Sequence, residues 1–294
     1  MSAVAEQAHA RSRTGDPGLP VVAYEPWRHG VLPRLQEIWT FRQLIGYTSV
    51  QFILKRYRQT YLGWFWIFLR PGLQIVATTF FFGGVLGVNY GDRPAAVYVA
   101  FSMAAWGLFE RTFHWGMRSV RMTRALSKGL HMPRSLAVVS AGAPALVDFL
   151  IHSIVAIGIV IYYQFALNNH YFAAPQRWLE GLVGIVLLLG FGLSSGLFTG
   201  PLMIITKEVR YIQVYLLQFW MFVTPVVYAQ ASSFQKVVEL NPLTAPVQMV
   251  TDGFLATGRP ATVSLVSTLI GLTVMVVGGL IFASRFERVA VARL

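Results

Sequence analysis

The densest group of residues able to bind an anion is a basic and aromatic run near position 60. Three cations fall within four positions, and aromatic side chains follow as far as Trp66. Arginine and lysine make charge-assisted hydrogen bonds to phosphate oxygens, so the run could hold the diphosphate of a lipid carrier. A plain membrane anchor is the alternative, with cations on lipid phosphate and rings at the headgroup level. The three cations are Lys55, Arg56 and Arg58, and the run continues to Arg70.

One carboxylate, Asp148, lies well inside an apolar stretch. Ionisable residues within membrane helices are expensive and suggest function. His152 follows four residues later and shares a helix face with it, so the two could form a hydrogen-bonded pair. A proton relay would need further ionisable groups in mid-membrane, but Glu110 and Glu180 fall near helix ends. The pattern favours a structural pair that locks helices together.

The sequence offers no catalytic or metal-binding set. Cysteine is absent, which excludes thiolate chemistry and disulfides. No G-x-x-x-x-G-K-[ST] loop or H-E-x-x-H motif occurs, so neither Walker-type ATP binding nor zinc hydrolysis is indicated. We therefore expect no catalysis within this chain and no cofactor of its own.

Composition identifies the elements that must position these residues. The chain has 294 residues, of which 55% are hydrophobic and 12% charged, whereas a soluble domain carries about 25% charged residues. A net charge of +12 could suggest nucleic acid, but the cations lie between apolar runs and form no single basic face. An all-α polytopic membrane protein is predicted.

Six apolar segments approach the roughly 20 residues needed to cross a bilayer. Residues 1–33 are predicted to be a disordered cytoplasmic tail, and 34–294 the transmembrane domain. The segment 34–60 should form an interfacial amphipathic helix, because Phe41, Leu44, Ile45 and Phe52 share a face; a short soluble helix packed on loops is the alternative. The predicted spans are about 67–90, 94–117, 136–163, 180–204, 211–229 and 261–284.

Charge between the spans predicts their orientation. With the amino terminus inside, every Lys and Arg except Arg93, Arg177, Lys236 and Arg259 falls on the cytoplasmic side. The positive-inside rule therefore predicts that both termini are cytoplasmic.

Two further patterns concern packing. Between the fifth and sixth predicted spans, short apolar pieces around 237–240 and 243–250 are divided by Asn241-Pro242. They are too short to span, so we expect re-entrant half-helices shielded by protein, with a surface loop as the alternative. In the fourth predicted span, Gly192, Gly196 and Gly200 recur every four residues, which allows close approach between helices.

Several motifs follow one another along the chain. They are Arg56-Tyr57-Arg58-Gln59-Thr60-x-Leu62-Gly63-x-x-Trp66, the segment Leu126–Ser135, Leu146-Val147-Asp148-Phe149, Val209-Arg210-Tyr211-Ile212, Thr224-Pro225-Val226-Val227-Tyr228 and Asn241-Pro242-Leu243-Thr244. In this order they resemble the transmembrane permeases of ABC polysaccharide exporters, which serve O-antigen, teichoic-acid and, more distantly, capsule export. The resemblance covers about residues 35–290, and Lys128-Gly129 and Thr206-Lys207-Glu208 depart from the usual pattern.

The resemblance implies a homodimer of six-span subunits in the bacterial inner membrane, bound to two copies of a separate ATPase that holds ATP and Mg. ATP hydrolysis there would open a channel for an undecaprenyl-diphosphate-linked polysaccharide, with O-antigen as the leading cargo. It also implies that the diphosphate is bound by Lys55, Arg56, Arg58 and Arg70. The implied ATPase-docking residues are Ser127, Lys128, Gly129, Leu130, His131, Met132 and Pro133.

Other functions remain open at this point. An ion-coupled secondary transporter should show repeated halves and several embedded charges, and neither is evident. A membrane glycosyltransferase or acyltransferase would need paired carboxylates or a His-Asp motif in a surface loop. An ABC exporter of small molecules shares the predicted architecture.

Overall fold

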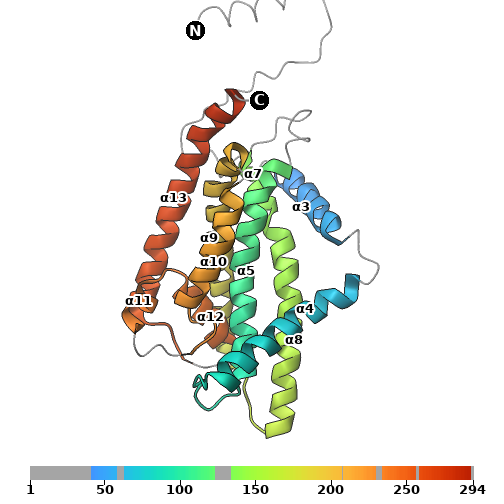
Figure 1. Cartoon of the computed structure of the whole chain (residues 1–294), viewed down its shortest axis with the longest axis vertical. Helices are drawn as coiled ribbons and strands as arrows, with labels where there is room; N and C mark the ends of the chain where they lie inside the picture. The colour runs from blue at the N-terminus through green and yellow to red at the C-terminus, as the bar shows by residue number, and fades with distance from the viewer. Residues whose placement is uncertain are drawn as a thin grey trace, which may run out of the picture. The chain divides into compact units, whose positions relative to one another are not determined.

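The computed structural model describes residues 41–57, 63–122, 134–206, 208–229, 234–255 and 258–292. All regular secondary structure in these ranges is helical, which confirms the all-α class (Figure 1). The longer helices are α4 (Gly63–Thr78), continued by the π-helix η1 (Thr79–Val85), then α5 (Ala95–Met122), α8 (Gly142–Leu167), α9 (Trp178–Ile205), α10 (Val209–Val223) and α13 (Thr262–Ala292). The shorter ones are α3 (Arg42–Tyr57), α7 (Arg134–Ser140), the 3-10 turn η2 (Pro175–Arg177), α11 (Gln235–Leu240) and α12 (Thr244–Leu255).

Among the described residues, four helical segments are long and apolar enough to cross a membrane, and they correspond to the first, third, fourth and sixth predicted spans. They are Phe65–Val85, Leu136–Leu167, Pro175–Met203 and Thr262–Ala283. The second and fifth predicted spans differ from them. Helix α5 has 28 residues but is less apolar, and α10 has 15 residues. The count of six spans stays a prediction.

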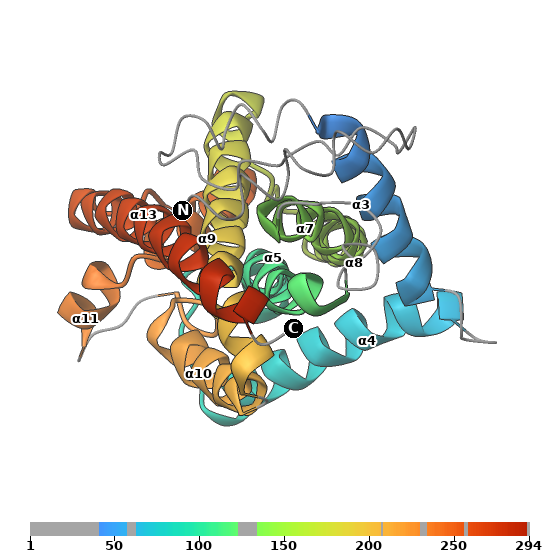
Figure 2. The same cartoon turned by 90° about the horizontal axis from the view of Figure 1, so that it is seen from above.

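Helix α5 forms the centre of the bundle. Seen from above, it lies among α4, α8, α9 and α10 (Figure 2), and it packs against α8, α9 and α12. Val97, Val99, Leu108 and Phe109 have no exposed surface. Because its neighbours shield it from lipid, α5 can carry polar residues that a lipid-facing helix could not.

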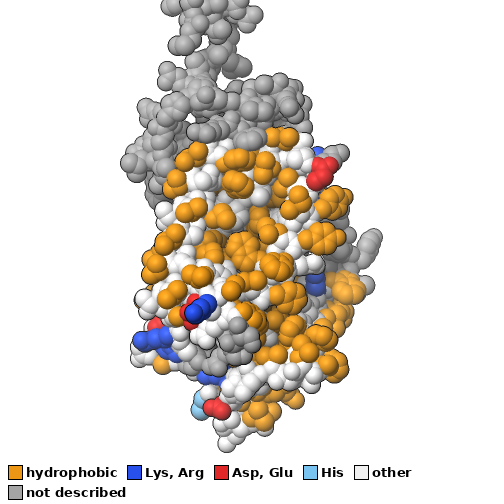
Figure 3. Space-filling model, turned by 60° about the vertical axis from the view of Figure 1, so that its left-hand side comes forward, with side chains coloured by type: hydrophobic (Ala, Val, Ile, Leu, Met, Phe, Trp, Pro, Cys, Tyr) orange, Lys and Arg blue, Asp and Glu red, His pale blue; other side chains and the backbone are white. Residues whose placement is uncertain are grey.

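The outer surface of the described bundle is apolar. On the face drawn in Figure 3, hydrophobic side chains cover most of the described surface. Val186, Phe219 and Leu269 are 67, 71 and 61% exposed. A soluble protein rarely exposes contiguous apolar surface on this scale, so this surface suits contact with lipid chains.

Helix α10 ends earlier than the predicted fifth span, 211–229. It stops at Val223, and Thr224–Ala229 has irregular backbone because Pro225 cannot continue the helix. Carbonyl groups freed in this way must find donors within a membrane protein. Residues on or beside α5 supply them: Tyr98 Oη donates to Pro225 O at 3.0 Å, Ser102 Oγ to Val226 O at 2.6 Å and Tyr90 Oη to Val227 O at 2.6 Å.

The two apolar pieces predicted after the fifth span are helices α11 and α12. Asn241, between them, is 5% exposed and joins the pair to α10. Its Nδ2 donates to Thr224 Oγ1 at 2.8 Å, and its Oδ1 accepts from Trp220 Nε1 at 2.9 Å. The placement of this pair at membrane depth stays a prediction.

The predicted amphipathic helix 34–60 is represented by α3, and its remaining residues lie outside the described ranges. Leu44 and Ile45 pack against Leu136 and Ala137. Phe52 is 4% exposed and stacks on Trp115, with ring centroids 6.0 Å apart. Leu44, Ile45 and Phe52 of the predicted apolar face therefore contact protein, whereas Phe41 is 36% exposed.

Candidate functional site

A polar pocket of about 520 Å³ lies among α4, α5 and α8. It is unusual in this bundle because most of its lining groups can carry charge, while the helices around it are apolar. Trp66 and Trp115 also line it. The ionisable lining residues are Arg70, Glu110, Arg111, His114, Arg118, Asp148 and His152.

Arg111 joins α5 to α8 inside this pocket. Its Nε lies 3.8 Å from Asp148 Oδ2, and its Nη2 donates to His152 Nε2 at 2.9 Å. His152 Nδ1 lies 3.3 Å from the Asp148 carbonyl oxygen. Because guanidinium only donates hydrogen bonds, these contacts fit an uncharged His152 that carries its proton on Nδ1. The charged group is therefore an Arg–Asp pair between two helices.

The sequence placed Asp148 and His152 correctly on one helix face but missed Arg111 as the partner. Arg111 was assigned to the cytoplasmic side of the second span, where the positive-inside rule explained its charge without any further role. Gly107 could have indicated that the Arg111 side chain lies along α5. A Cβ at Gly107 would lie 2.9 Å from Arg111 Nη1, so glycine leaves room for the guanidinium to lie along α5.

The remaining charges give the pocket a positive excess. Glu110 Oε1 lies 3.9 Å from His114 Nε2, and Arg70 and Arg118 are exposed in the pocket wall. Arg111 and Asp148 offset each other, which leaves two arginines and one carboxylate. The arrangement can bind an anion beside the two tryptophan rings. In the part of the chain that the structure describes, no three His, Asp or Glu side chains are grouped to hold a metal ion.

The four predicted anion-binding residues are only partly placed. Arg70 lies in the polar pocket. Lys55 is exposed on α3, where Arg56 also lies, and Arg58 falls outside the described residues. The structure therefore adds Arg111 and Arg118 to the surroundings of Arg70. The implied docking residues Ser127 to Pro133 all lie outside the described ranges, between the ends of α5 and α7.

The glycine stripe of α9 lies against α5. A Cβ at Gly192 would fall 2.5 Å from Thr112 Cβ, and one at Gly196 would fall 2.7 Å from the Cα of Gly116. Gly200 is buried on the same helix. Side chains larger than hydrogen would separate the two helices.

The same stripe contains a serine in a G-x-S-x-G pattern, Gly192-Leu193-Ser194-Ser195-Gly196. A nucleophile elbow requires a sharp turn between a strand and a helix. Ser194 instead lies within α9, and its Oγ donates to the Gly190 carbonyl at 2.7 Å. The pattern is a packing feature here.

A second charged cluster lies at the opposite end of α5, where α9 begins and α12 ends. Arg177 Nη2 lies 3.4 Å from Glu180 Oε2, and Arg259 Nη2 lies 3.9 Å from Glu180 Oε1. Arg93 Nη1 donates to Tyr171 O at 3.0 Å. Burial raises the pKa of Asp252 to about 7, although Arg177 and Arg93 act in the opposite direction. Arg93, Arg177 and Arg259 are three of the four cations that the sequence analysis assigned to the non-cytoplasmic side.

Comparison with known proteins agrees with the resemblance noted in the sequence. No family model matches the chain. The chain is 23% identical over 216 residues to the O-antigen export system permease protein RfbA of Myxococcus xanthus, and the match covers 71% of this chain and 79% of that protein. This distant similarity supports the resemblance to the ABC permease family that the sequence motifs indicate.

Proposed function

We propose that the chain is the transmembrane permease subunit of an ATP-driven exporter that moves lipid-linked polysaccharide across the bacterial inner membrane. The observation that carries this proposal is the 216-residue similarity to an O-antigen export permease. The apolar bundle surface and the polar pocket support it, because an exporter of this kind needs helices that cross the bilayer and a place for polar groups between them. O-antigen linked to undecaprenyl diphosphate is the first cargo to test, ahead of teichoic acid, capsule and small molecules.

The proposed assembly is a homodimer with two copies of an ATPase subunit, and both termini are cytoplasmic. ATP and Mg would be bound by that subunit and not by this chain. The decisive experiment is co-expression with the ATPase gene nearest in the genome, followed by purification through a tag on this chain. Recovery of both proteins, with ATP hydrolysis that needs both, is the expected result. Export by this chain with no companion subunit, or a periplasmic terminus, would refute the proposal.

The cations near position 60 supply a sharper test. Arg56 and Arg58 are proposed to bind the cargo diphosphate, with Lys55 beside them. Arg56→Ala combined with Arg58→Ala should lower surface glycan at least tenfold while the ATPase still co-purifies. Arg259→Ala is the matched control, because this arginine is 78% exposed in the other charged cluster. Normal surface glycan in the double variant would contradict the headgroup role.

The docking role is proposed for residues 127–133. Lys128→Glu should reverse one charge in that segment and reduce recovery of the ATPase, with Lys236→Glu as the charge-matched control outside it. Equal recovery of the ATPase by both variants would exclude a docking contact at Lys128.

A further inference from the structure

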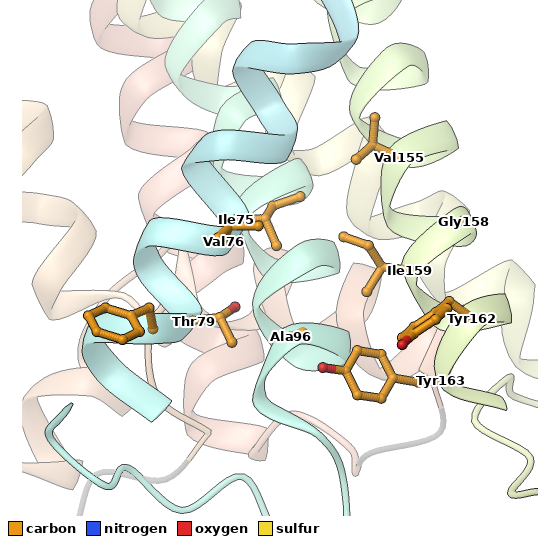
Figure 4. A pocket seen from close by; sticks show the side chains of 10 residues that line it. Ile75, Val76, Thr79, Ala96, Val155, Gly158, Ile159, Tyr162 and Tyr163 are labelled. Atoms are coloured by element: carbon orange, nitrogen blue, oxygen red, sulfur yellow. The ribbon is translucent and has the colours of Figure 1, made fainter. Parts of the chain in front are cut away.

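A second pocket lies directly beyond the polar one, on the same three helices. It has a volume of about 500 Å³ and an almost wholly apolar lining. Figure 4 shows Ile75 of α4 and Ile159 of α8 facing each other across it, with Tyr163 pointing toward Ala96. We call the two pockets together the α4–α8 groove.

The polar and apolar parts of the groove follow one another in the same order on both helices. On α4 and η1, residues 66–74 line the polar part and residues 75–80 the apolar part. On α8, the polar part is lined at 148–152 and the apolar part at 155–163. Arg70 and Phe80 are separated by about 15 Å at the helical rise of 1.5 Å per residue.

The apolar part of the groove is open to the membrane. Val76, Phe80 and Tyr162 remain 64, 69 and 67% exposed. Gly158 widens it, because a Cβ at that position would meet no atom within 4 Å. A hydrocarbon chain can therefore enter sideways from the bilayer without movement of the helices.

The charge of the polar part suits one kind of headgroup. Its described residues Arg70, Arg118 and Glu110 leave an excess of one positive charge once Arg111 is offset by Asp148. A phosphodiester carries one negative charge, whereas a diphosphate carries more. Arginine forks also match phosphate oxygens in geometry.

We propose that the α4–α8 groove binds one anionic phospholipid as a resident lipid of the bundle. Its phosphodiester contacts Arg70 and Arg118 beside Trp66 and Trp115, and one acyl chain lies between Ile75 and Ile159. With the predicted orientation, this lipid belongs to the cytoplasmic leaflet. The inference goes beyond the proposed export function and does not depend on the cargo.

The test is lipid retention, measured by native mass spectrometry of the protein released from nanodiscs. The nanodiscs contain phosphatidylglycerol and phosphatidylcholine in equal amounts. One phosphatidylglycerol per chain should be retained in preference to phosphatidylcholine. Arg70→Gln combined with Arg118→Gln should lower that retention at least tenfold, whereas Arg259→Gln should leave it unchanged. If the Arg70→Gln, Arg118→Gln double variant and the Arg259→Gln variant retain equal amounts of phosphatidylglycerol, the proposal is overturned.

A steric variant tests the chain-binding part without any change in charge. Gly158→Leu should fill the apolar part and lower retention at least tenfold. Gly278→Leu on α13 is its control, since a Cβ there also meets no atom within 4 Å. Retention unaffected by Gly158→Leu would overturn the proposal. Displacement of the phosphatidylglycerol by an equimolar polyprenyl diphosphate would also overturn it, because the groove would then be a cargo site. The same holds if lipid-free protein changes its oligomeric state when Gly158 is replaced by leucine, because the groove would then be a contact between copies of the chain. ATPase co-purification is independent of all these outcomes.

Discussion

Replacing Arg111 alone should destabilise the bundle more than replacing Arg111 and Asp148 together. The two groups lie 3.8 Å apart, with side chains 19 and 6% exposed. At an effective dielectric constant of about 20, their attraction is about 4 kcal/mol. Arg111→Gln removes the opposite charge beside the buried Asp148 carboxylate, and Asp148→Asn removes the opposite charge beside the partly buried Arg111 guanidinium. Each should cost about 3 kcal/mol. The double variant removes both charges and should cost about 2 kcal/mol, which is less than the cost of either single variant.

The assay is a double-mutant cycle on the free energy of unfolding in one detergent, followed by circular dichroism. The pair Arg259 and Glu180 is the control, because its atoms lie 3.9 Å apart but Arg259 is 78% exposed. Its coupling energy should stay below about 1 kcal/mol. If the effects of Arg111→Gln and Asp148→Asn simply add, or if both pairs show the same coupling, then burial does not strengthen the Arg111–Asp148 pair and the reasoning fails.

Three further outcomes follow from single contacts. Gly196→Ala should lower the free energy of unfolding by about 1–3 kcal/mol, because its Cβ would fall 2.7 Å from a backbone Cα; Gly72→Ala, with nothing within 4 Å, should not lower it, and equal effects would contradict the close crossing. Asn241→Ala should cost about 1–3 kcal/mol by leaving buried partners without hydrogen bonds, and an unchanged melting temperature would show that these bonds are dispensable. Asp252 has a folded pKa of about 7 against 3.8 for the free side chain, so the fold favours its protonated form. Stability should fall as pH rises from about 4 to 7 and level off above that, and melting curves of Asp252→Asn should lack this component; identical pH profiles for the two proteins would exclude it.

Much of the helical architecture could be predicted because membrane helices follow a simple rule of length and apolarity. The segments 136–163 and 261–284 were predicted within a few residues of the apolar stretches 136–167 and 262–283. Arg93, Arg177 and Arg259 were all predicted to lie on the same side of the membrane, and the structure places them in one charged cluster. Such features depend on local composition, and local composition is fully visible in a sequence.

The parts that were missed depend on contacts between distant segments. The end of α10 at Val223 was missed because Pro225 is followed by apolar residues, and an apolar run continues the pattern of a span. The irregular backbone is acceptable because Tyr90, Tyr98 and Ser102, more than a hundred positions earlier, donate hydrogen bonds to its carbonyl groups. Arg111 was missed for the same reason, since its partner lies on a different helix and its charge already had a simpler explanation.

The low apolarity of α5 follows from its position at the centre of the bundle. Helices in lipid gain little from hydrophobic association with each other, so close packing and polar contacts must specify their arrangement. Helix α5 provides both at three levels: the hydroxyls of Tyr98 and Ser102 hold the backbone after α10, Arg111 binds α8, and Gly116 admits the backbone of α9. A helix with such contacts cannot also be uniformly apolar. A hydropathy threshold therefore passes over the helix that organises the bundle, and Arg111, one of the residues that lower its apolarity, also lines the candidate site.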